Sequence, residues 1–98
     1  MKVAKVIGNI WATRKEARLN GLTLLIVQEL DVSDGACTGA PFVAADVIGA
    51  GFGETVLVVG GSSARGAAGD MSIPVDAAVT AIIDNFELAP KERGNKNV

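Results

Sequence analysis

The amino-acid sequence predicts an all-β domain, a small five-stranded barrel with one short helix before the last strand. Five short apolar segments follow one another along the 98 residues, separated by turns rich in glycine. Two of these segments, 22–31 and 54–60, are apolar on both faces, which is typical of strands that are covered on both sides. A further segment, after Ser72, begins with residues that favour a helix start.

The first strand is predicted over residues 2–12. Its even positions carry small or apolar side chains, while its odd positions mix Lys5 and Asn9 with apolar residues. Residues 13–20 are polar and end at Gly21, so a loop is predicted there, with room for a one-turn helix.

The second strand is predicted over residues 22–31. Leu24 and Ile26 lie on one face of this strand, and Leu25 and Val27 lie on the other. Only the inner face of a small barrel meets the core. The outer face of this strand therefore needs a partner.

The middle of the chain is predicted as a loop at 32–41, a short strand at 42–47 and a tight turn, GAGFG, at 49–53. Glycines in such a turn allow positive φ angles and a close approach of the backbone. A fourth strand follows at 54–60, and residues 61–70 are predicted as a long flexible connection.

The predicted helix covers residues 73–79. Ser72 and Pro74 suit its start, and Asp76 lies in its first turn, where the helix dipole favours a carboxylate. The last strand is predicted at 80–88. These elements indicate a closed or nearly closed antiparallel barrel of OB-like size, although the pattern also fits another small β-barrel.

Chain length predicts a single domain, residues 1–89, followed by a polar tail, residues 90–98. The sequence has no histidine, which removes the commonest general base and transition-metal ligand. Cys37 is the only cysteine, so neither an intrachain disulfide nor a thiolate metal cage is expected. We predict no catalytic site, no cofactor and no metal.

Hydrophobic residues make up 49% of the chain, and the mean hydropathy is +0.37. The longest apolar stretch, 22–27, is far shorter than the ~20 residues that span a bilayer, and the N-terminus shows no signal peptide. We therefore expect a cytoplasmic protein, not bound to membranes, that covers its apolar surface with other subunits.

Two glycine-rich motifs invite functional interpretations that their context disfavours. IGAGFGE is followed by a strand, whereas a dinucleotide-binding motif opens a helix. GGSSARG lacks the lysine of a phosphate-binding loop. Backbone amides and Arg65 there suit weak anion binding, but we favour Arg65 as an anchor between subunits, paired with Asp76 or another carboxylate.

Nucleic acid is a further partner that barrels of OB-like size bind. Such proteins place several aromatic residues on a basic face, whereas this chain has four aromatic residues and a net charge of −2. We therefore predict no nucleic-acid partner and keep an OB-type nucleic-acid-binding module as the alternative function.

Several segments of the chain together resemble a known family, the EutN/CcmL vertex proteins of bacterial microcompartments. They cover about four-fifths of the chain in the family's order and spacing, whereas the loop 32–42 and the tail after Leu88 show no family pattern. The matching segments are AKVIGNIWAT (4–13), Lys15, LNGLTLLIVQELD (19–31), VAADVIGAGFGETVLVVGGSSAR (43–65) and PVDAAVTAIID (74–84).

The resemblance implies a structural protein without enzymatic activity, in the shell of a bacterial microcompartment such as a carboxysome or a metabolosome. It implies a homopentamer of OB-like barrels that caps the five-fold corners of the shell, where hexameric shell proteins surround it. A five-fold ring is heterologous, because each subunit shows one face to its left neighbour and a different face to its right neighbour.

On this basis we assign three groups of residues to the assembly. The five-fold axis or the subunit seam is predicted at Gly60, Gly61, Ser62, Ser63, Ala64 and Arg65. The subunit interface is predicted at Leu25, Val27, Val56, Val58 and Asp76. The rim that touches hexameric shell proteins is predicted at Arg14, Lys15 and Arg18.

Overall fold

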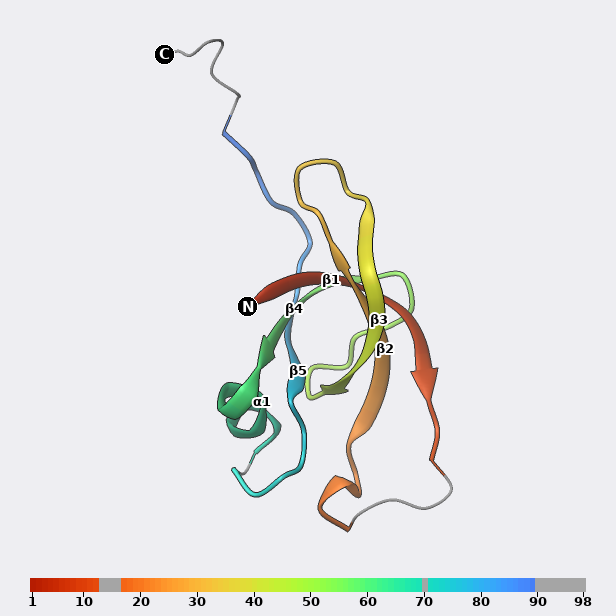
Figure 1. Cartoon of the computed structure of the whole chain (residues 1–98), viewed down its shortest axis with the longest axis vertical. Coiled ribbons are helices and arrows are strands. Elements are labelled where there is room, and N and C mark those ends of the chain that lie inside the picture. The colour runs from red at the N-terminus through yellow and green to blue at the C-terminus, as the bar shows by residue number, and fades with distance from the viewer. Residues whose placement is uncertain (13–16, 70, 90–98) are drawn as a thin grey trace.

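Five strands and one α-helix make up the chain in the computed structural model, which describes residues 1–12, 17–69 and 71–89. The strands close into a barrel in the order β1-β2-β3-β5-β4 (Figure 1). This confirms the predicted five-stranded barrel with a short helix before the last strand. In chain order the elements are β1 (Lys2–Ile10), the 3₁₀ turn η1 (Ala17–Leu19), β2 (Thr23–Leu30), β3 (Cys37–Asp46), β4 (Thr55–Gly60), α1 (Gly61–Ala68) and β5 (Ala77–Ile82).

The barrel is closed by a short seam between β3 and β5. These two strands run parallel and are joined at two residue pairs, Ala45 with Ala78 and Asp46 with Val79. All other neighbouring strands pair antiparallel over longer stretches. Among the described residues, the first part of β3 therefore pairs with β2 alone, and no described strand lies along its other edge.

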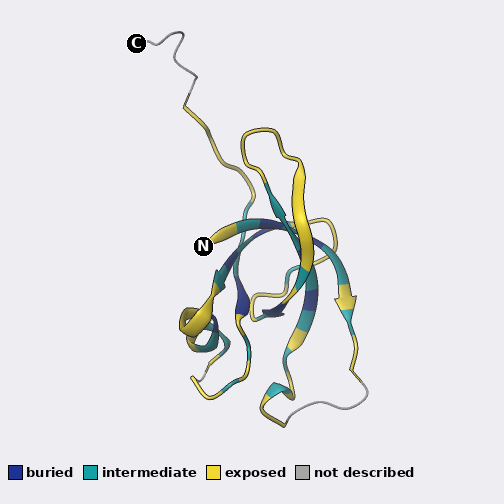
Figure 2. Ribbon diagram, in the orientation of Figure 1, coloured by how far each residue is buried: buried dark blue, intermediate teal, exposed yellow. Residues whose placement is uncertain are grey.

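The core lies inside the barrel and is built from alternate residues of each strand, as Figure 2 shows by the buried segments near the middle of the strands. Small and branched side chains fill it because a five-stranded barrel has a narrow interior. Its buried members are Ala4, Val6, Leu25, Val27, Ala44, Val56, Val58, Ala77 and Val79.

The helix lies at Gly61–Ala68, where a flexible connection was predicted, and the prediction of a helix over 73–79 is wrong. Two glycines bound it: Gly60 is extended at its start, and Gly69, at φ 119°, ends it with a left-handed cap. Ser72 and Pro74, whose start signal predicted the helix, lie in the segment before β5 and outside any helix or strand.

Alanine residues allow α1 to sit close on the outside of the barrel, where it packs against β4 and β5. Ala45, Ala64 and Ala78 form a second buried cluster beneath the helix. Strand β5 begins at Ala77, three residues before the predicted start, and ends at Ile82 rather than 88. The helix thus covers part of the outer face and leaves the rest open.

The β2–β3 hairpin extends beyond the barrel (Figure 1), because β3 starts at Cys37 and not at residue 42. Cys37 pairs with Leu30 across the hairpin. The turn is held by Asp31, whose carboxylate accepts hydrogen bonds from Ser33 Oγ at 2.6 Å and Ser33 N at 2.9 Å. These two bonds, the side-chain bond first, lower the pKa of Asp31.

Candidate assembly surfaces

The four hydrophobic residues predicted at the subunit interface lie instead in the core of their own subunit. Leu25, Val27, Val56 and Val58 are between 0% and 3% exposed. Their side chains point into the barrel, so in this fold they are not available to a neighbouring chain. The alternation along β2 and β4 was correct, but the faces were assigned the wrong way round. Asp76 is exposed, and its predicted role at an interface stays a prediction.

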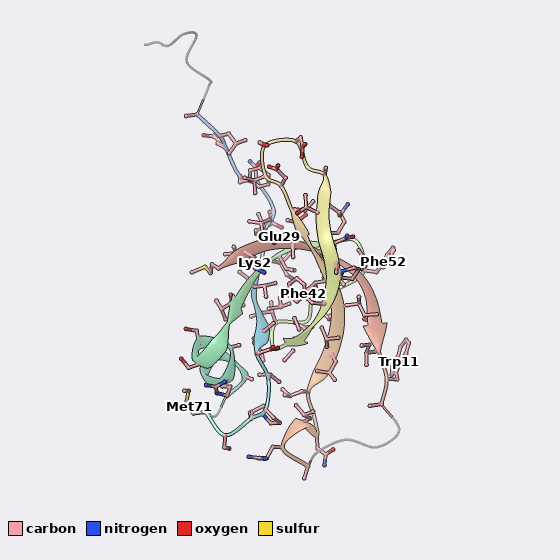
Figure 3. The ribbon with its side chains drawn as sticks, in the orientation of Figure 1. Lys2, Trp11, Glu29, Phe42, Phe52 and Met71 are labelled. Carbon is pink, nitrogen blue, oxygen red and sulfur yellow. The ribbon has the colours of Figure 1, made fainter. Side chains whose placement is uncertain are left out.

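The outer face of the barrel carries the apolar residues that remain available for a partner. Leu24, Ile26 and Leu57 are half-buried on the outside of β2 and β4, and Val43 on β3 is 42% exposed. Two aromatic side chains protrude much further: Trp11 is 85% exposed and Phe52 is 80% exposed. Both lie on the side of the barrel away from α1 (Figures 1 and 3).

Phe52 sits on a tightly held turn, which we call the Phe52 turn (residues 47–54). The carboxylate of Asp46 accepts hydrogen bonds from the backbone N–H groups of three residues in this turn. The donors are Ile48 at 3.0 Å, Gly49 at 3.1 Å and Ala50 at 3.0 Å. Such a set holds the start of the turn in a single conformation.

The end of the Phe52 turn is tied both to itself and to β1. Glu54 accepts a hydrogen bond from the backbone N–H of Gly51. The N–H of Gly53 donates to the carbonyl of Val6 at 2.8 Å, and the N–H of Val6 donates to the carbonyl of Glu54 at 2.9 Å. Gly53 has φ +85°, which side chains with a Cβ rarely adopt. Phe52 is therefore an exposed aromatic residue on a rigid support.

A groove of about 540 Å³ lies beside the short β3–β5 seam, and we call it the seam groove. Its walls are mostly apolar. Lys2 stands at its edge, with its Nζ 5.3 Å from the ring centre of Phe42 and 3.8 Å from Glu29 (Figure 3 labels all three). The residues that line the groove are Met1, Lys2, Phe42, Val43, Val58, Val59, Gly60, Asp76 and Ala77.

The GGSSAR segment, predicted to lie at an axis or a seam, starts α1. Gly60 precedes the helix, Gly61 to Arg65 lie in it, and the N–H of Gly61 donates to the carbonyl of Asp76 at 3.1 Å. The segment and Asp76 are thus neighbours through their backbones. Within the described residues the ion pair found is Lys2 with Glu29. Arg65 forms none with a described carboxylate of its own chain.

The predicted rim is only partly within the described residues, because Arg14 and Lys15 lie outside them. Arg18 lies in η1, and its guanidinium donates a hydrogen bond to the carbonyl of Ser72 at 2.9 Å. This bond ties η1 to the loop before β5.

The described residues offer no group of three or more Cys, Asp or Glu side chains that is able to hold a metal ion. Cys37 is exposed and free. No helix in the described ranges is long and apolar enough to cross a membrane.

Sequence reasoning missed the seam groove and the role of Asp46 in the Phe52 turn. An aspartate directly before a glycine-rich turn is a recognisable signal for side-chain capping of backbone N–H groups. The groove had no such signal, because its lining comes from four strands that are distant in sequence.

The fold and these surfaces define a class: a small barrel with a filled core, a protruding aromatic turn and an apolar groove on its outside. The chain belongs to the EutN/CcmL family, whose model, described as ethanolamine utilisation protein EutN/carboxysome, matches residues 1–84. This confirms the family resemblance found in the sequence.

Individual relatives match nearly the whole chain. The carboxysome shell vertex protein CcmL of Synechocystis sp. is 43% identical, over 98% of this chain and 95% of the relative. The microcompartment shell vertex protein GrpN of Rhodospirillum rubrum is 41% identical, over 89% of this chain and 97% of the relative. The solved structure of an ethanolamine utilization protein, EutN, has a TM-score of 0.85 at 43% identity and covers 90% of this chain and 91% of its own. The solved structure of GrpN, a pentameric microcompartment shell protein, has a TM-score of 0.82 at 39% identity. It covers 91% of this chain and 100% of its own.

Proposed function

We propose that this protein is a structural, non-enzymatic subunit that forms homopentamers at the five-fold vertices of a bacterial microcompartment shell in the cytoplasm. The observation that carries the proposal is similarity over 89–98% of this chain to shell vertex proteins, one of them solved as a pentameric shell protein. A shell of flat hexamers has no curvature and closes only where five-fold units replace hexamers. The vertex is therefore a position that a ring of five subunits fills.

The outside of the barrel supports this proposal. A heterologous ring needs two unlike surfaces on each subunit, one for each neighbour. The Phe52 turn and the seam groove are such a pair, because one protrudes and the other is hollow. Hexameric shell proteins are the proposed partners at the rim, and no nucleic acid, cofactor or membrane is part of the proposal.

Shell closure tests the function directly. Hexameric shell proteins are co-expressed with and without this chain, and the products are viewed by electron microscopy. We expect closed polyhedra in its presence and open sheets or tubes in its absence. Closed polyhedra formed equally well without the chain would contradict a vertex role.

The alternative nucleic-acid-binding function is tested by gel shift with single-stranded DNA and RNA across a salt titration. Binding through phosphates weakens steeply as salt rises. We expect no shift at any salt concentration. A shift at low salt that disappears with added salt would favour the alternative.

Substitution of Arg65 by alanine should weaken the pentamer. A guanidinium that pairs with a neighbour's carboxylate contributes about 1–3 kcal/mol to each contact, and all five contacts lose it together. Arg65→Lys is the matched control, because it keeps the charge but loses the two-pronged geometry. Sedimentation over a concentration series measures the effect. If the Arg65→Ala variant formed the same oligomer and the same shells as the native chain, Arg65 would neither anchor one subunit to the next nor line the five-fold axis.

Reversal of charge at Lys15 should impair incorporation into shells while the isolated pentamer stays intact. A rim charge acts on the contact with hexameric proteins and not on the ring itself. The yield of this chain in purified shells, relative to the hexameric proteins, measures incorporation. Lys5→Glu, in β1, serves as the control for a general effect of charge. Equal incorporation of the Lys15→Glu variant and the native chain would mean that Lys15 does not contribute to the contact with hexameric proteins.

A further inference from the structure

We propose that the Phe52 turn of one subunit inserts into the seam groove of the next subunit, and that this contact closes the ring. The inference rests on the proposed pentamer and identifies the residues that join its subunits. It assigns a role to two surfaces that the barrel itself does not use.

The Phe52 turn has the properties of an interface anchor. Its aromatic side chain is 80% exposed, although burying it would bring a large gain in free energy. The turn that carries it is already fixed by the Asp46 and Glu54 carboxylates and by two hydrogen bonds to Val6. Little conformational entropy is left to lose on binding, so most of the gain from burial is retained.

The seam groove has the size and chemistry to receive a phenyl ring. A cavity of about 150 Å³ accepts benzene, and the groove measures about 540 Å³. It therefore takes the ring together with part of the flanking turn. Val58, only 3% exposed, belongs to the core, while Phe42 and Val43 supply apolar contact nearer the surface.

A second copy of this chain is the occupant that the geometry selects. The groove reaches Gly60, the residue directly before α1, whereas Phe52 lies on the side of the barrel away from α1 (Figures 1 and 3). Phe52 is also bound through its turn to β1 and cannot reach the groove of its own subunit. A protruding site and a receiving site on different sides of one chain generate a head-to-tail contact, which is the contact of a cyclic ring.

Photo-crosslinking from position 52 tests the contact. The chain is made with p-azidophenylalanine in place of Phe52, which preserves the ring, and is irradiated as a purified oligomer. We expect a ladder of crosslinked species ending at five chains, with the crosslinked peptides containing groove residues such as Met1, Phe42 or Asp76. The same probe in place of Trp11, which is equally exposed, is the control and should yield no crosslink to the groove.

A substitution at Phe52 measures how much this residue contributes to the affinity between subunits. Phe52→Asp should raise the dissociation constant of each subunit contact by about thirtyfold or more, the effect of losing an interface anchor. Val32→Asp, at an apolar surface residue in the β2–β3 turn, should change it less than threefold, roughly the scatter of a neutral surface site. Both positions are solvent-exposed, so circular dichroism should show folded chains in each case.

The outcomes separate this inference from the function on which it rests. A native pentamer whose crosslinks lie outside the groove, or that is unaffected by Phe52→Asp, overturns the inference and leaves the vertex function standing. A native chain that stays monomeric overturns both.

Discussion

Replacing Leu25 by alanine is expected to reduce the free energy of unfolding by about 2–5 kcal/mol. Leu25 is among the largest fully buried side chains and is 1% exposed. The barrel around it is closed by hydrogen-bonded strands and cannot collapse to fill the space. Loss of apolar contact and the cavity that remains both contribute to the cost. Urea unfolding at a fixed chain concentration, followed by circular dichroism, measures it.

Leu57→Ala makes the same chemical change on the outer face and serves as the matched control. Leu57 is half-buried on β4, between the core residues Val56 and Val58. Because its side chain lies outside the barrel, we expect a loss of about 1 kcal/mol or less. In the dissociated subunit, where no neighbour covers the outer face, a loss for Leu57→Ala as large as that for Leu25→Ala would mean that the inner and outer faces are assigned incorrectly.

Asp46→Ala is expected to reduce the free energy of unfolding by about 1.5–3 kcal/mol. The substitution leaves the N–H groups of Ile48, Gly49 and Ala50 without their common acceptor. It also releases the turn that presents Phe52, so the pentamer should weaken as well. Urea unfolding gives the stability, and amide hydrogen exchange reports the loss of protection at the three N–H groups.

Asp46→Asn separates the contributions of the two carboxylate oxygens. Oδ1 accepts the bonds from Ile48 and Gly49, and an asparagine retains that acceptor. Oδ2 accepts the bond from Ala50, and an amide nitrogen in its place removes it. We expect less than half of the loss caused by alanine. Unchanged stability and exchange in Asp46→Ala would exclude the carboxylate as the support of the turn.

The strands were predictable because each carries a local signal. Alternation and turn residues placed a predicted strand over at least part of each observed strand, and the apolar character of both faces of 22–31 and 54–60 predicts that the outer face needs a cover. Which face is inner was not predictable from two equally apolar faces. Pairing with neighbouring strands decides it, and that information is not local.

The predicted and observed elements differ at two further places, the helix and the start of β3, and in both the local sequence signal is weak or absent. The helix at Gly61–Ala68 consists largely of small residues, so its apolar stripe is faint, and only its bounding glycines mark it. The extra length of β3 depends on its pairing with β2. Among the site residues, the predicted pairing of Arg65 with Asp76 or another carboxylate between subunits stays a prediction; within one chain, the GGSSAR segment meets Asp76 through the hydrogen bond from Gly61 N–H to its carbonyl.

Native mass spectrometry of the purified chain at micromolar concentration tests the central claim most directly, namely that unlike outer surfaces of this barrel join identical subunits into a ring. We predict one dominant species of five copies of the 10.0 kDa chain, about 50 kDa. A folded chain that remains at the mass of one copy across that concentration range would contradict the claim.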